Sequence, residues 1–237
     1  MTRGPFDGLQ GGVAAALMCA EIEALAARDS LGFVAAFTAH FLKPVPLQEL
    51  SVAIEPVRIG KRVSVVDAGL ANASGQRCAI GRATLIAAMA NDALPVPPAG
   101  NVVDPERLPL SPWPKPHDQP WLMDAMERRH GADDTMWFHR TRPIVGADGV
   151  MTVVLPAADF ARGIWPPLGA DKRVRAAIPN PDVTVHLLRA PRSPWIGLAA
   201  ASAWSREGIG SGWARLHDPQ GIIGHVTMSI AVTLLEG

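Results

Sequence analysis

The sequence predicts an α+β fold made of two similar halves, each combining an apolar helix with a meander of antiparallel strands. Three observations predict this arrangement. Each half contains a run of apolar residues at helical spacing, alternating apolar and polar residues follow that run, and short sequence matches relate one half to the other. The 237 residues are therefore expected to form two small units rather than one large core.

A proline-rich seam separates the two halves. Nine of the 22 prolines lie between residues 91 and 120. Proline fixes φ and lacks an N–H donor, so this segment is predicted to be an extended linker. The expected organisation is an N-terminal unit at residues 1–90, a linker at 91–119 and a C-terminal unit at 120–237.

Two ordered matches indicate an internal repeat. Residues 38–43 (Thr-Ala-His-Phe-Leu-Lys) match residues 184–189 (Thr-Val-His-Leu-Leu-Arg), and residues 80–84 (Ile-Gly-Arg-Ala-Thr) match residues 223–227 (Ile-Gly-His-Val-Thr). The two offsets, 146 and 143 residues, differ only by the length of a loop. A duplicated unit explains both matches.

The same elements are expected in each half. In the first half, apolar residues at helical spacing predict a helix at 9–28, and alternation predicts strands at 33–41, 50–55, 61–71 and 76–88. In the second half, a helix is expected at 153–164, ended by Pro166 and Pro167. Strands are expected there at 120–129, 135–144, 182–189, 194–205, 209–217 and 221–235.

Composition excludes several classes of protein. Lys and Arg (22) balance Asp and Glu (22), so the chain lacks the positive charge of a nucleic-acid or anionic-membrane binder. The two cysteines form no CxxC pair, which argues against structural zinc and a disulfide framework. No apolar run approaches the roughly 18 residues of a membrane span, and the first residues lack a signal-peptide pattern. A cytoplasmic protein is expected.

Several short motifs follow one another along the chain. They are Leu-Gln-Gly-Gly at 9–12, Phe-Thr-Ala-His-Phe-Leu-Lys-Pro at 37–44, Arg-Ile-Gly-Lys-Arg at 58–62, Ala-Ala-Asp-Phe at 157–160, Pro-Asp-Val-Thr-Val-His-Leu-Leu-Arg at 181–189, then Trp195 and Asp-Pro-Gln-Gly at 218–221. In order and spacing they resemble the thioesterase II (TesB-like) family of acyl-CoA thioesterases. The resemblance implies a tandem (double) hotdog fold and hydrolysis of a fatty acyl-CoA to free acid and CoA.

The resemblance also implies a catalytic carboxylate at Asp182, which would activate water as a general base, a role worth about 10²- to 10⁴-fold. The repeat places Ala36 at the equivalent position, so only one half carries the acid. The family's hydroxyl position falls on Ala203, and a slip of one residue would bring Ser202 there. Its amide position falls on Met228, which is then expected to contact the substrate.

Other residues are expected to bind the substrate. A helix that begins at Gly11 and Gly12 presents N–H groups where charge develops on the thioester oxygen. Arg58 and Arg62 are candidates for contacts with the CoA phosphates. His186 lies four residues from Asp182 and is a further candidate. The resemblance implies no metal or cofactor, since CoA enters as part of the substrate, and association as a homodimer through the sheets.

Two other functions stay open from the sequence. The nonpolar Ala203 and Met228 are compatible with an acyl-CoA-binding protein that has lost turnover. A hotdog hydratase or dehydratase needs an acid paired with a histidine, which only Asp182 and His186 could supply. Asp159, in the second helix motif, is a secondary candidate acid.

Overall fold

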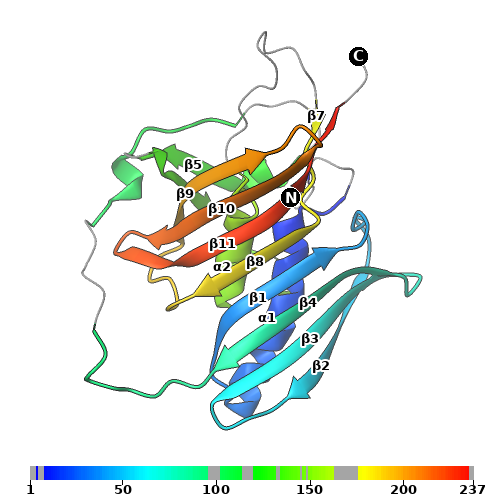
Figure 1. Cartoon of the computed structure of the whole chain (residues 1–237), viewed down its shortest axis with the longest axis vertical. Helices are drawn as coiled ribbons and strands as arrows, with labels where there is room; N and C mark the ends of the chain where they lie inside the picture. The colour runs from blue at the N-terminus through cyan, green and yellow to red at the C-terminus, as the bar shows by residue number, and fades with distance from the viewer. Residues whose placement is uncertain are drawn as a thin grey trace.

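A computed structural model describes residues 4, 8–95, 102–113, 120–131, 134–144, 146–147, 149–162 and 176–234. It confirms the predicted α+β double hotdog: one ten-stranded antiparallel sheet curves around two helices that pack against each other (Figure 1). The strand order is β2-β3-β4-β1-β8-β11-β10-β9-β6-β5. Consequently β1 and β8, from different halves, form the centre of a single sheet.

The first half contains one long helix and four strands: α1 (Gly11–Asp29), β1 (Phe33–Phe41), β2 (Leu50–Arg58), β3 (Val63–Asn72) and β4 (Arg77–Ile86). The side chain of Gln10 accepts from the Val13 N–H and caps the start of α1. Ser30, in the left-handed region with φ 55°, ends the helix. Most side chains of α1 are buried, because the sheet and the second helix cover it on several sides.

The second half contains a shorter helix, α2 (Val150–Ala158). Its strands and turns are η1 (Pro105–Arg107), η2 (Leu122–Ala125), β5 (Met126–His130), β6 (Met136–Arg140), β7 (Ala176–Ala177), β8 (Asp182–Leu187), β9 (Trp195–Trp204), β10 (Ile209–Asp218), β11 (Gly221–Ala231) and β12 (Thr233–Leu234). The helix begins and ends earlier than the predicted 153–164. Glu23 of α1 accepts from its first N–H groups, which accounts for the earlier start. Pro166 and Pro167 lie outside the described residues.

The repeat has a structural explanation in the pairing of β1 with β8. Thr38 lies directly opposite Thr184, its equivalent in the repeat, and their hydroxyl oxygens are 3.0 Å apart. Strands β1, β4, β3 and β2 on one side of this point therefore correspond to β8, β11, β10 and β9 on the other. This strand order and the antiparallel pairing relate the two halves by an approximate two-fold axis that passes between the two threonines.

The described part of the proline-rich seam packs against the second half. Arg128 and Arg129 of β5 donate to four backbone carbonyls within residues 106–112. The indole of Trp113 donates to the Met126 carbonyl oxygen at 2.9 Å. Residues 105–113 are thus held on β5, and the segment includes a turn of 3₁₀ helix rather than being extended throughout.

The two faces of the sheet differ in burial. In β8, Val183, Val185 and Leu187 face the helices and are buried, whereas Thr184 and His186 lie on the outer face. The same alternation along the other long strands forms one core between sheet and helices. Within the described part of the chain, no helix is both long and apolar enough to cross a bilayer.

Candidate active site

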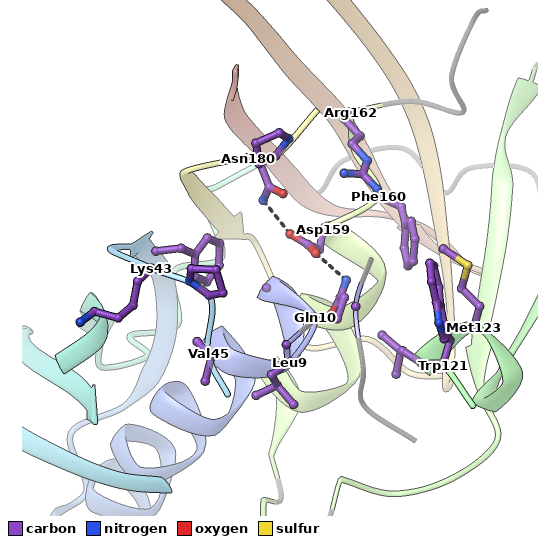
Figure 2. Close-up of a pocket in the computed structure, with 17 residues that line it drawn as sticks. Leu9, Gln10, Lys43, Val45, Trp121, Met123, Asp159, Phe160, Arg162 and Asn180 are labelled. Carbon is purple, nitrogen blue, oxygen red and sulfur yellow. Dashed lines mark hydrogen bonds between the residues drawn. The ribbon is translucent and has the colours of Figure 1, made fainter. Parts of the chain in front are cut away.

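A cavity of about 370 Å³ lies at the N-terminal end of α1, a volume within the usual range for small-molecule sites (Figure 2). The end of α2, the segment before β8 and the η2 turn form its other walls. Apolar side chains dominate: Leu9, Phe41, Val45, Trp121, Leu122, Met123 and Phe160. The polar or charged side chains lining it are Gln10, Lys43, Asp159, Arg162 and Asn180.

The two glycines at the start of α1 allow the two helices to approach closely. A Cβ atom at Gly12 would overlap the carbonyl oxygen of Leu155 in α2 and lie 2.8 Å from the Asp159 Cβ. A Cβ atom at Gly11 would lie 3.0 Å from the Phe41 ring. Glycine is therefore required at position 12 by packing, and Gly11 lines the cavity.

Asp159 is the central acid of the cavity. It follows α2 directly, and its side chain is 7% exposed. Gln10 Nε2 donates to its Oδ2 at 2.5 Å, and Asn180 Nδ2 donates to its Oδ1 at 2.7 Å. The backbone N–H of Gly12 also donates to this carboxylate. One buried side chain thus joins the start of α1, the end of α2 and the approach to β8.

Burial raises the pKa of Asp159, and the nearby Arg162 charge with the three hydrogen bonds lowers it only in part. Burial also lowers the pKa of Arg162, which the Asp159 charge partly restores. The Arg162 guanidinium donates to the Ile178 carbonyl oxygen at 3.2 Å. The cavity therefore contains an acid and a base that each reduce the cost of burying the other.

Asp182 is the first residue of β8 and follows Asn180 by two residues, but it does not line the cavity. Strand alternation places its side chain on the outer face of the sheet, with Thr184 and His186. Asp182 Oδ1 accepts from the Ser229 N–H at 2.9 Å, and no other hydrogen bond from the described residues reaches its carboxylate. The Asn180 amide donates to the Asp182 carbonyl oxygen at 3.3 Å. Asp182 is partly exposed and lies opposite His40 of β1.

Ser202 of β9 and Met228 of β11 lie on either side of Gly212 of β10, on the face of the sheet that meets the end of α2. A Cβ atom at Gly212 would lie 2.7 Å from the Arg162 Cα, so this face of the sheet packs against the residues that follow α2. The ladder between β9 and β10 is continuous, so no slip moves Ser202 to the position of Ala203. Neither Ser202 nor Met228 lines the cavity, and the structure does not bring them to Asp182.

His186 is exposed on the outer face of β8, where its ring stacks on His225 of β11 at 5.0 Å. It is separated from Asp182 by four residues of strand, about 13 Å. The structure therefore does not place these two side chains as the acid–histidine pair that a hydratase or dehydratase would need.

Arg58 and Arg62 lie at the hairpin between β2 and β3, at the end of the sheet away from the start of α1 (Figure 1). The register places this hairpin beside Phe33, whereas the cavity begins at Phe41. The length of β1 separates the two places by about 26 Å. The basic residues that line the cavity are instead Lys43 and Arg162.

Sequence reasoning missed Gln10 and Asn180, the two amides that hold Asp159. Gln10 lies inside the quoted Gly-Gly motif and Asn180 lies two residues before Asp182, so proximity in sequence was an available signal. Phe160 of the aromatic wall lies in the quoted Ala-Ala-Asp-Phe motif, whereas Trp121 carried no comparable signal. Among the described residues, no group of three or more His, Cys, Asp or Glu side chains could hold a metal ion.

The fold and this cavity define a tandem hotdog protein with an apolar-walled site between its halves that contains one carboxylate, Asp159. A model of the acyl-CoA thioesterase N-terminal domain matches residues 2–86, and one of the acyl-CoA thioesterase C-terminal domain matches residues 90–232. The chain belongs to the acyl-CoA thioesterase family and is a thioester hydrolase. No curated protein matches its sequence significantly.

Solved structures share the fold at low sequence identity. A hotdog-fold protein of unknown function from Alicyclobacillus acidocaldarius has a TM-score of 0.72 and 17% identity, over 98% of this chain and 89% of that one. The tesB protein of Mycobacterium avium subsp. paratuberculosis has a TM-score of 0.66 and 14% identity, over 97% and 89%. Acyl-CoA thioesterase II TesB2 of Mycobacterium marinum has a TM-score of 0.63 and 15% identity, over 92% and 87%.

Proposed function

We propose that the protein hydrolyses fatty acyl-CoA thioesters at the cavity beside the start of α1. The observation that carries this proposal is the combination, in one cavity, of an apolar wall for an acyl chain and a helix N-terminus beside the Asp159 carboxylate. A homodimer and a cytoplasmic location stay predictions from the sequence.

In the proposed reaction a carboxylate is the general base, and two acids are candidates: Asp182, which the resemblance implies, and Asp159, which lines the cavity. Asp182 Oδ1 is held by the Ser229 N–H and the residue is partly exposed, whereas the oxygens of Asp159 accept from Gln10 and Asn180. The base takes the proton as the water oxygen bonds to the thioester carbonyl carbon. The C–S bond then breaks, the proton passes to the leaving thiolate, and free acid and CoA result. The partial positive charge at the start of α1 stabilises the oxyanion formed in between.

Asp182→Asn is expected to lower kcat by about 10²- to 10⁴-fold, because the amide cannot take the proton from water. Release of free thiol from a panel of saturated acyl-CoAs of increasing length measures this effect. Asp67→Asn is the matched control, since Asp67 lies on the outer face of β3 in an ion pair with Arg82. Unchanged thiol release by Asp182→Asn would show that this carboxylate is not the base.

A second function, acyl-CoA binding without turnover, is favoured by one observation: the family's hydroxyl and amide positions carry Ala203 and Met228. The same panel separates the two functions. Tight binding of acyl-CoA by calorimetry, with no thiol release above the rate of the buffer, would replace hydrolysis by binding as the function.

Lys43 is expected to contribute more to CoA binding than the predicted pair Arg58 and Arg62, because Lys43 lines the cavity. Lys43→Ala should raise KM for acyl-CoA several-fold at low salt, and added salt should reduce the difference by screening. The Arg58→Ala/Arg62→Ala variant should change KM less. N-acetylcysteamine thioesters, which lack the phosphates, are the control substrate. If the arginine variant raised KM more than Lys43→Ala does, the CoA phosphates would bind at the β2–β3 hairpin instead.

A further inference from the structure

The cavity has two ends of different chemical character. Figure 2 shows Lys43 and Trp121 on opposite sides of Asp159. At one end Lys43 is partly exposed and the neighbouring Pro44 is exposed. At the other end Trp121 and Leu122 are buried, with 9% and 2% of their surface exposed. The cavity therefore opens beside Lys43 and is closed beside Trp121.

The charges in the cavity indicate which end receives which part of an acyl-CoA. The Lys43 ammonium makes no hydrogen bond or ion pair with another described residue. The charge of Arg162, in contrast, is opposed by the Asp159 carboxylate. An uncompensated cation at the open end suits the phosphates of CoA. The closed end, which is apolar, is then the place for the acyl group.

The Phe160 ring lines the closed end and is held from behind by two other aromatic rings, neither of which lines the cavity. It stacks on Phe138 of β6 with ring centroids 5.3 Å apart, and it packs against Trp113 at 5.0 Å. The Trp113 indole donates to the Met126 carbonyl oxygen, and the Arg128 guanidinium lies 4.2 Å from the Trp113 ring centroid. Because the three rings are packed together and anchored to β5, Phe160 cannot turn aside for a longer ligand.

Phe160 also lies next to the place where the thioester would react. It directly follows Asp159 in the sequence, so the Cα atoms of the two residues are about 3.8 Å apart. Asp159 in turn contacts the start of α1, since a Cβ atom at Gly11 would lie 3.2 Å from the Asp159 Oδ1. An acyl group whose carbonyl lies at the start of α1 therefore reaches the Phe160 ring within a few carbons.

We propose that Phe160 limits the length of the acyl chain and that the substrates are short- and medium-chain acyl-CoAs. This inference rests on the proposed function, because it names the substrate class of that reaction. Burial of each further methylene is expected to raise kcat/KM about fourfold. The value of kcat/KM should therefore rise with chain length until the chain reaches Phe160, and then stop rising or fall.

The dependence of kcat/KM on chain length tests this inference, measured as release of free thiol from straight-chain acyl-CoAs between butanoyl-CoA and dodecanoyl-CoA. In the wild-type protein the rise should end within this series. In Phe160→Ala it should continue to longer chains, and kcat/KM for the first substrate beyond the wild-type limit should increase about 10-fold, the gain from about two further methylenes. Phe160→Leu removes less of the side chain and should shift the limit less, which keeps the test open if Phe160→Ala does not fold.

Phe33→Ala is the matched control, because Phe33 is a partly buried core residue at the other end of β1 and does not line the cavity. It should leave the chain-length limit unchanged. The inference would be wrong if the wild-type protein showed no limit up to dodecanoyl-CoA, if both Phe160 variants kept the wild-type limit, or if Phe33→Ala shifted it equally. In each of these cases hydrolysis would stand as the function. Absence of thiol release from every acyl-CoA of the series would instead remove the proposed function, and this inference with it.

Discussion

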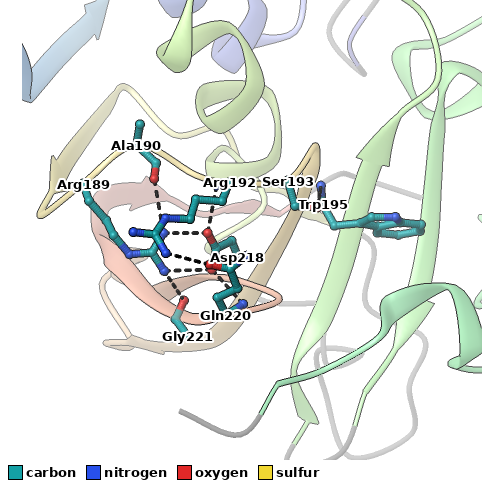
Figure 3. Close-up of polar contacts among 8 residues, drawn as sticks. All are labelled: Arg189, Ala190, Arg192, Ser193, Trp195, Asp218, Gln220 and Gly221. Atoms are coloured by element: carbon teal, nitrogen blue, oxygen red, sulfur yellow. Dashed lines mark hydrogen bonds and ion pairs between the residues drawn. The ribbon is translucent and has the colours of Figure 1, made fainter. Parts of the chain in front are cut away.

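Asp218→Ala is expected to lower the free energy of unfolding by about 3–5 kcal/mol, the usual cost of removing one partner of a buried ion pair. Asp218 is 1% exposed, and Arg189 donates to both of its oxygens, at 2.6 and 2.8 Å (Figure 3). The backbone N–H groups of Arg192 and Gln220 donate to it as well, each at 2.9 Å. Without the carboxylate, a guanidinium and two N–H groups lose their acceptor.

Urea unfolding at pH 7 measures this loss. Asp67→Ala is the control, since the Asp67–Arg82 pair is exposed and should contribute far less. Burial alone would raise the pKa of Asp218, but the hydrogen bonds from Arg189, Arg192 and Gln220 outweigh it and lower the pKa to about 2. The contribution of the ionised Asp218 carboxylate to the free energy of unfolding should therefore be complete above pH 4 and disappear as the pH falls through 2. Equal losses in the two variants would contradict the assigned role of Asp218.

The ion pair also explains a difference between the two halves. Lys43 is the repeat equivalent of Arg189, but the corresponding turn of the first half, between β3 and β4, carries Asn72 and Ser74 instead of an acid. Asn72 Oδ1 accepts from the N–H groups of Ser74 and Gln76, which closes that turn without a cation. Lys43 therefore has no carboxylate at this turn to pair with, as Arg189 pairs with Asp218, and it lines the cavity instead.

The fold could be predicted because its strongest signals are local. Alternation in segments such as β1 and β10 follows from one buried face, and it sets strand limits to within a few residues. The start of α2 could not be predicted, because the carboxylate that caps it belongs to Glu23, more than 120 residues away in sequence. Pairing of β1 with β8 was indicated only through the repeat.

The site could be predicted less well, because its contacts are between distant segments. The Gly-Gly motif and Asp159 each carried a signal, but nothing in the sequence shows that Gly12 and Asp159 touch. The resemblance directed attention to Asp182 without indicating that the Ser229 N–H binds it. Basic residues at the β2–β3 hairpin were obvious in the sequence, yet only the register of the sheet shows how far they lie from the cavity.

Stability is expected to decrease as the pH rises from 4.5 to 7, because of Glu23. Its carboxylate accepts from the N–H groups of Met151 and Val150 at the start of α2, and it links the two helices. Burial raises its pKa from 4.5 to about 7, and the two backbone hydrogen bonds oppose this only in part. In that pH range the folded protein holds a proton that the unfolded chain releases, so unfolding becomes easier as the pH rises.

The size of this effect is about 3 kcal/mol, since each unit of pKa difference corresponds to about 1.4 kcal/mol. Urea midpoints at pH 4.5, 6 and 8 measure it, and Glu23→Gln provides the matched variant. The amide is neutral at every pH and its oxygen can still accept from Met151, so the variant should lose much of the pH dependence and be more stable than wild type at pH 8. Asp159, whose pKa burial also raises, is expected to contribute a slope of the same sign. If Glu23→Gln kept the full slope, or were less stable than wild type at pH 8, the Glu23 carboxylate would be ionised in the folded protein. It would then stabilise α2 as a charged helix cap.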